Sequence, residues 1–175
     1  MNGLFLLNNG LINAKVIILK TISNAAIQDV VKNNLKKGMY CAETTVIAIT
    51  ETQGIESKLL TKAATAFCSG MSGTCGTCGA LTGGTMGLSA LLGRDEPDGS
   101  VEPAYQATHQ LITEFEQAFG SKNCHELLGC DLGTVEGQTR FMEDKLHQRC
   151  VTYISKSTEI ANRILNTLNK TNNPE

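Results

Sequence analysis

The sequence predicts an all-α protein, a compact multi-helix bundle with one glycine-rich loop. Apolar residues recur at three- and four-residue spacing through most of the chain, and no segment shows the alternation of a strand. The chain has 175 residues, of which 41% are hydrophobic, which is enough to bury a core without disulfide support. We expect an N-terminal arm over residues 1–22 and a single helical domain over residues 23–170.

The individual helices are predicted from apolar stripes and from their end signals. The clearest one begins near Pro103, a residue tolerated in a first helical turn, and ends at Gly120. Ser57 is an expected N-cap for a helix that reaches Phe67. Further helices are expected over residues 23–35, 42–53, 78–92, 124–128 and 151–168, with a loop over 130–137.

Charge and hydropathy exclude several classes of protein. The net charge is -2 and the isoelectric point is about 5.9, so the chain has no basic field for nucleic acid or an anionic membrane. No apolar run reaches the roughly 18–20 residues of a membrane helix. The first twenty residues lack the early positive charge and the cleavage site of a signal peptide. We therefore predict a cytoplasmic protein with no nucleic-acid partner and no membrane insertion.

Seven cysteines are many for such a chain. A reducing cytosol disfavours structural disulfides, and an odd number leaves one thiol unpaired if the others all bridge. Clustered cysteines in that compartment favour metal, cluster or redox chemistry. The seven are Cys41, Cys68, Cys75, Cys78, Cys124, Cys130 and Cys150.

Four of these cysteines, Cys41, Cys78, Cys124 and Cys150, lie at or near the start of a predicted helix. The first turn of a helix offers unpaired N–H groups and the positive end of the helix dipole. That environment lowers the pKa of a thiol, and the thiolate is both the nucleophile and the metal ligand. The ordinary alternative is that each cysteine is a small buried apolar residue. We predict that these four are the catalytic or metal-ligating residues.

Glycines surround one of these cysteines. Gly70, Gly73, Gly76 and Gly79 recur at every third position, and a backbone of this kind can wrap closely around a bound group. On this basis Gly76, Gly79 and Gly83 are predicted to contact a cofactor. Gly79, Gly83 and Gly87 also share one helix face, and for that face we favour tight helix packing.

Cys75 and Cys78 form a C-x-x-C pair. Such a pair can be a redox dithiol or can supply two ligands to a metal or cluster, so Cys75 joins the candidate metal ligands. His147 lies three residues before Cys150, a spacing that suits a ligand or a base. His109 and His125 carry no comparable signal.

The cysteines and their neighbours resemble a known family. Cys41 lies in YCAE, Cys78 opens CGALTG, Cys124 lies in FGSKNCHELLGCDL, and Cys150 follows. Over most of the chain this order resembles the redox-active protein family named C_GCAxxG_C_C, which has one Cys, a Cys-Gly-Ala-x-x-Gly motif and two further Cys. The resemblance implies a small helical protein with redox-active cysteines. It also suggests a distant relation to the cluster-bearing domain of split-Soret cytochromes, although no C-x-x-C-H haem motif is present.

Three functions remain open on this basis. The first is an iron–sulfur cluster, or another thiolate-ligated metal, used for electron transfer or sensing. The second is a thiol–disulfide oxidoreductase or redox switch. The third is a structural zinc site or an interaction module without turnover. A redox partner protein is expected, the sequence is compatible with a homodimer, and Cys68, Cys75 and Cys130 lie outside the family pattern.

Overall fold

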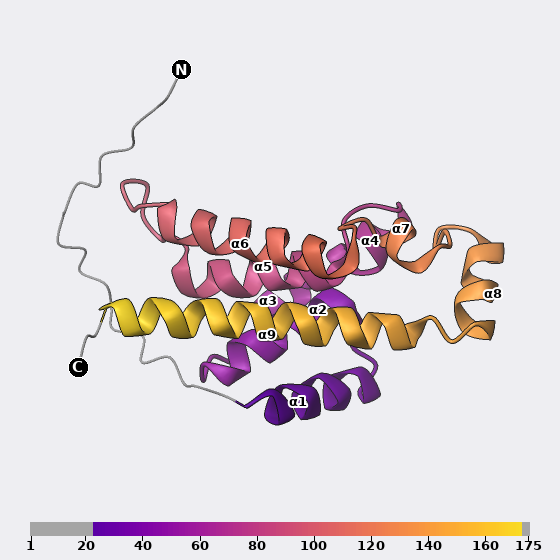
Figure 1. The fold of residues 1–175 in the computed structure, drawn as a ribbon, viewed down its shortest axis with the longest axis horizontal. Helices are drawn as coiled ribbons and strands as arrows, with labels where there is room; N and C mark the ends of the chain where they lie inside the picture. Colours follow the sequence, from indigo (N-terminus) through magenta and orange to yellow (C-terminus); the bar gives the residue numbers. More distant parts are fainter. Residues whose placement is uncertain (1–22, 173–175) are drawn as a thin grey trace, which may run out of the picture.

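The computed structural model describes residues 23–172, and over that range it contains helices and no strand (Figure 1). The all-α prediction is therefore confirmed. The arm expected over residues 1–22 lies outside the described range. The elements are α1 (Asn24–Lys36), α2 (Cys41–Thr52), α3 (Lys58–Ala64), the 3-10 turn η1 (Thr65–Phe67), α4 (Cys68–Gly73), α5 (Gly79–Leu92), α6 (Glu102–Phe119), α7 (Cys124–Leu128), α8 (Val135–Glu143) and α9 (His147–Asn172).

Helix ends follow the capping chemistry of the sequence. The Ser57 hydroxyl accepts the Leu60 N–H at 3.2 Å and starts α3. Pro103 lies in the first turn of α6, and Gly120 ends that helix with a φ of 78°. The Asn123 side chain accepts the Glu126 N–H at 3.2 Å and starts α7. These boundaries agree with the predicted ones.

Two segments differ from expectation. Residues 130–137 were expected to form a loop, yet α8 begins at Val135, because the Thr134 hydroxyl accepts the Gly137 N–H at 3.0 Å. Only Gly137 of this helix is buried, so the sequence lacks the apolar stripe from which α8 could have been predicted. α9 begins at His147, about one turn before the expected start.

The long helices α5, α6 and α9 pack against one another along their length, with α2 against α5 and α9 (Figure 1). Their contact surfaces form the main core. Phe115, Phe119 and Tyr153 add a ring cluster with centroids 4.8–6.1 Å apart. The large side chains that are fully buried there include Ile49, Leu81, Leu88, Leu111, Ile154 and Leu165.

Close contact between α2 and α5 depends on glycine. A Cβ atom at Gly83 would overlap the Ala42 carbonyl oxygen and lie 2.9 Å from the Thr45 Cβ. At Gly87 it would lie 2.9 Å from the Ile49 Cβ. The glycine face of α5 therefore packs against α2, as favoured from the sequence.

The chain reverses direction so that the starts of α2, α5 and α9 meet at one end of the bundle, beside α4, α7 and α8 (right side of Figure 1). Cysteines distant in sequence are thereby brought to one place. Among residues 23–172, none of the helices combines the length and apolarity required to cross a bilayer.

Candidate functional site

Four cysteines line one cavity at this end of the bundle. Cys41 is the first residue of α2, Cys78 immediately precedes α5, Cys124 is the first residue of α7, and Cys150 lies in the first turn of α9. The cavity has a volume of about 650 Å³. Its other walls are mainly apolar and include Leu127, Leu128, Phe141, Val151 and Ile154. The structure thus gathers the four cysteines that the sequence singled out.

Backbone hydrogen bonds fix Cys78 and Cys124 beside each other. The Cys78 N–H donates to the Lys122 carbonyl, and the Cys124 N–H donates to the Gly76 carbonyl, both at 2.8 Å. Thr77 and Asn123 form an isolated antiparallel bridge between the same two segments. The glycine-rich loop therefore holds the segment that carries Cys124.

Cys41 is positioned by a buried carboxylate. The Tyr40 N–H donates to the Glu43 Oε2 atom at 2.8 Å, which closes the first turn of α2. The Thr65 hydroxyl donates to the Glu43 Oε1 atom at 2.8 Å, so the same side chain ties η1 to α2. Gly79 leaves room for the Cys41 sulfur, because a Cβ atom at that position would overlap it.

The segment α4 is a left-handed turn rather than a regular α-helix, and its Ser69 borders the cavity. Ser69, Gly70, Met71 and Ser72 all have φ between 54° and 64°, and Gly73 has φ 81°. Left-handed conformation costs an L-residue with a side chain about 1–2 kcal/mol, and three of these five residues are not glycine. The turn brings the Ser69 N–H within 3.4 Å of the Cys41 Sγ, to which it donates a hydrogen bond. Such backbone strain is typical of functional sites.

The four thiols differ in acidity. A hydrogen bond from Cys68, aided by the N–H groups of Ser69 and Ala42 and opposed by burial, lowers the pKa of Cys41 to about 7. Burial raises the pKa of Cys78 and of Cys124 to about 12, and it raises the pKa of Cys150 as well. The prediction that every helix start lowers a thiol pKa was therefore wrong for these three. At Cys78 the N–H groups of Ala80 and Leu81 do lower the pKa, but desolvation outweighs them.

Comparison with protein-family models matches residues 39–164 to the family described as "putative redox-active protein (C_GCAxxG_C_C)". The protein belongs to this family. The matched range contains all four cavity cysteines of the C_GCAxxG_C_C pattern. No curated protein and no solved structure matches the chain, and the distant relation to split-Soret cytochromes that the sequence suggested is not shown.

The cavity is a partial fit to a metal. Its four sulfur donors suit iron or zinc, since thiolates bind both. Within residues 23–172, however, no three Cys, His, Asp or Glu side chains converge closely enough to hold one ion. A single zinc ion needs four sulfurs at about 2.3 Å from one centre. The four cysteines instead line a cavity of about 650 Å³.

Cys75 does not line the cavity, although the sequence placed it among the metal ligands. Its thiol is a hydrogen-bond partner of Asp131, and its Sγ lies 3.8 Å from the His125 Nδ1. Cys75 has φ 59°, so the chain turns sharply between the two cysteines of the C-x-x-C pair. The two thiols therefore have different surroundings and do not form one ligand pair here.

Of the three glycines that were predicted to contact a cofactor, one lines the cavity and two do not. Gly79 lines the cavity. Gly83 instead packs against Ala42, and Gly76 packs against Met71 and Gly70. Gly76 and Gly83 therefore allow close packing of the chain, and nothing supports their direct contact with a cofactor.

Sequence reasoning gave no role to Cys68, whose thiol shares a hydrogen bond with that of Cys41. Cys68 is buried at 4% exposure and is the first residue after η1. No sequence motif links it to Cys41. His147, by contrast, does line the cavity, as its spacing from Cys150 suggested.

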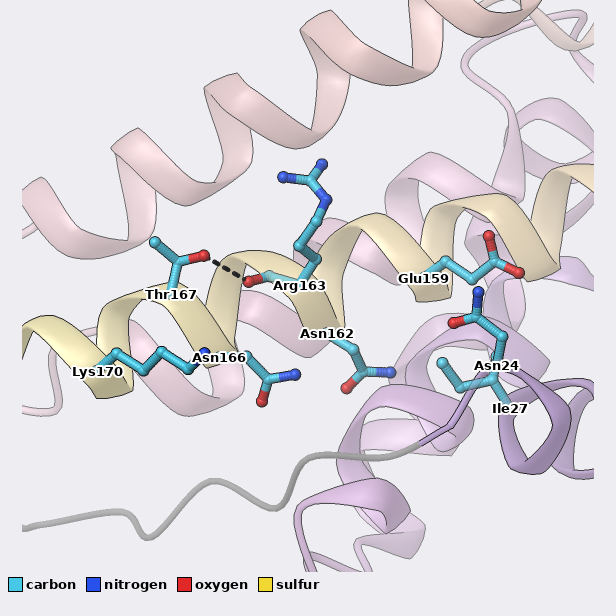
Figure 2. Close-up of a pocket in the computed structure, with 8 residues that line it drawn as sticks. All are labelled: Asn24, Ile27, Glu159, Asn162, Arg163, Asn166, Thr167 and Lys170. Carbon is cyan, nitrogen blue, oxygen red and sulfur yellow. Dashed lines mark hydrogen bonds between the residues drawn. The ribbon is translucent and has the colours of Figure 1, made fainter.

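A second hollow, of about 320 Å³, lies between the start of α1 and the C-terminal half of α9. Figure 2 shows Asn162 and Asn166 pointing to one side of α9 and Arg163 pointing to the other. The Nδ2 atom of Asn162 is buried without a hydrogen-bond partner among the described residues. The lining of this second hollow is mainly polar and contains no cysteine, so we exclude the hollow as the redox site.

Proposed function

We propose that this redox-active protein binds an iron–sulfur cluster in the cysteine cavity and uses it for electron transfer or sensing. The ligands would be Cys41, Cys78, Cys124 and Cys150. The observation that carries the proposal is the convergence of these four residues, from four separate helices, on one cavity. Four cysteine thiolates are the usual ligand set of such clusters.

The volume of the cavity, about 650 Å³, leaves room for a group with several metal atoms. Within residues 23–172, no three candidate ligands are close enough together to hold a single ion. The structural zinc alternative would need all four sulfurs to close around one atom.

The chain itself supplies the environment of the bound group. The cluster, when bound, would provide reversible one-electron transfer. Phe141, Val151 and Ile154 keep water from the cavity walls, and the low polarity of such a wall influences a reduction potential. The Ser69 N–H already donates to the Cys41 sulfur, and hydrogen bonds to ligand sulfurs also tune the potential.

Purification without oxygen, followed by reconstitution with ferrous iron and sulfide, tests the proposal. We expect visible absorbance, bound iron and sulfide in stoichiometric amounts, and an electron paramagnetic resonance signal on reduction. Cys78→Ser should abolish these signals. Cys130→Ser is the matched control, because Cys130 is equally buried at 5% exposure but does not line the cavity. Full cluster occupancy in Cys78→Ser would contradict the assignment.

Thiol–disulfide exchange is a second candidate, favoured by the lowered pKa of Cys41. In that case the protein should remain colourless after reconstitution. It should reduce a small disulfide in a reaction that Cys41→Ser abolishes and Cys130→Ser leaves intact. The two candidates therefore give opposite results in the reconstitution assay.

A further inference from the structure

We propose that Cys68 is the disulfide partner of Cys41, and that a Cys41–Cys68 disulfide prevents metal loading by withdrawing Cys41 from the ligand set. This inference rests on the proposed function, because it describes the control of the same site. It assigns a role to a cysteine outside the family pattern.

The two thiols are already in contact. The Cys41 and Cys68 side chains share a hydrogen bond, and the Ser69 N–H donates to the same Cys41 sulfur at 3.4 Å. A disulfide joins two sulfurs at about 2.05 Å, and Cys41 already packs against the small cluster that contains Cys68. Cys41 lines the cavity, whereas Cys68 is buried at 4% exposure and does not, so an oxidant meets the Cys41 sulfur first.

The surroundings of Cys68 make it the partner rather than a ligand. Cys68 touches Cys41 but does not line the cavity, whereas Cys78, Cys124 and Cys150 do. It packs in a small separate core with Ala42, Val46 and Ala64, and its Sγ lies 3.8 Å from the Ala64 carbonyl oxygen. Cys41 thus contacts both the cavity and the small core that contains Cys68. Its sulfur can form a disulfide or a metal bond, but not both.

The oxidant can be a low-molecular-weight disulfide such as oxidised glutathione. The Cys41 thiolate attacks one sulfur, forms a mixed disulfide and releases one glutathione thiolate, which takes up the proton that Cys41 lost. The Cys68 thiol then loses its proton and attacks the Cys41 sulfur, which releases the second glutathione as a thiol. Two cysteines lose two electrons and two protons, and one glutathione disulfide becomes two glutathione molecules.

Disulfide mapping tests the pairing directly. Reduced, cluster-free protein is treated with oxidised glutathione, its remaining thiols are blocked, and it is cleaved with trypsin and cyanogen bromide. Cleavage after Met39, Lys58, Lys62 and Met71 leaves Cys41 in residues 40–58 and Cys68 in residues 63–71. Cys75 and Cys78 are then in residues 72–86, so no ambiguity remains.

We expect residues 40–58 and 63–71 to be recovered as one disulfide-linked pair. The pair should also form in Cys130→Ser and should be absent in Cys68→Ser, with helical circular dichroism preserved in both. Recovery of residues 40–58 unlinked, or linked to residues 72–86 or to the peptide that contains Cys150, would overturn the pairing.

Iron uptake tests the control step. Oxidised wild-type protein should take up almost no iron and sulfide, and dithiothreitol should restore uptake. Cys68→Ser should load equally before and after the oxidation step. Equal loading of oxidised and reduced wild-type protein would overturn the control step. If reduced protein also takes up no iron, the proposed function fails and the control step with it, while the peptide pair still decides the disulfide.

Discussion

Among the seven cysteine sulfurs of this protein, that of Cys41 has the most unusual surroundings. It accepts hydrogen bonds from a thiol and from a backbone N–H, and it lies at the start of a helix. Cys78, Cys124 and Cys150 have comparable positions at helix starts, but they are neutral thiols because burial dominates. Reactivity is therefore determined by the immediate partners of each sulfur.

The lowered pKa of Cys41 predicts how alkylation depends on pH. In reduced, cluster-free protein, the rate at which iodoacetamide modifies Cys41 should rise with a midpoint near pH 7, because the pKa is about 7. Cys78 should stay unmodified through the same range, since its pKa is about 12. Mass spectrometry of the alkylated peptides measures both rates.

Cys68→Ala should move the Cys41 midpoint upward, because the hydrogen bond from Cys68 is the largest cause of the lowered pKa and alanine has no donor to replace it. Cys130→Ala should leave the midpoint in place. An unchanged midpoint in Cys68→Ala would show that the two side chains do not interact in solution.

At the scale of elements, the helices were predictable where the chain carries local signals. Ser57, Pro103 and Gly120 each act within one turn of their own position, so sequence alone indicates them. α8 was missed because its N-cap, Thr134, precedes a helix with almost no buried face.

The left-handed turn could not be predicted for a different reason. Ser69, Met71 and Ser72 have no intrinsic preference for positive φ. Tertiary contacts hold them there, including the hydrogen bond that the Ser72 hydroxyl donates to the Ala66 carbonyl at 2.8 Å. The contact between Cys41 and Cys68 depends on this turn. It could therefore not be predicted from the sequence either. The four cavity cysteines were identified from their places at helix starts and from the family pattern, neither of which requires knowledge of the turn.

Glycine substitutions should have opposite effects in two parts of the chain. Ser69→Gly should stabilise the protein by about 1 kcal/mol, since glycine adopts positive φ at little cost. Ser89→Gly, at an exposed right-handed position of α5, should destabilise it by about 0.5–1 kcal/mol. Urea unfolding measures both. A loss of stability in Ser69→Gly would mean that the turn is not left-handed in solution.

Packing of α2 against α5 should make Gly83→Ala destabilising. The added Cβ gains about 1 kcal/mol of helix propensity. It also overlaps the Ala42 backbone, which cannot rotate away, and overpacking of this kind costs about 1–3 kcal/mol or more. Urea unfolding should show a net loss. Ser89→Ala, at an exposed position of the same helix, serves as the control and should be neutral or slightly stabilising.

For the molecule as a whole, the buried thiols predict a stability that falls in alkali. Cys78, Cys124 and Cys150 have pKa values raised above the ordinary 9.0, so the folded state holds their protons more tightly than the unfolded state. Their contribution is complete below pH 9 and is lost as the pH rises from there toward about 12. Urea unfolding of reduced, cluster-free protein should therefore show declining stability above pH 9.

Cys41 contributes in the opposite direction, because its pKa is lowered from 9.0 to about 7. Its share is present above pH 9 and is lost as the pH falls through 7. Cys124→Ala should flatten the alkaline decline, whereas Cys41→Ala should leave it. A profile that stays level above pH 9 would indicate that the thiols are not buried as described.

The last helix of the chain supplies one wall and one sulfur of the cavity, through Cys150, while the first sulfur comes from Cys41 near the opposite end of the described chain. A nascent chain on the ribosome cannot complete the set before α9 has emerged and docked. Under the proposed function, the cluster would therefore be bound only after α9 has docked, unlike in short zinc modules, where the ion organises the chain. A prematurely terminated product that ends before α9 would lack both Cys150 and the wall beside it, and would keep only three of the four proposed ligands.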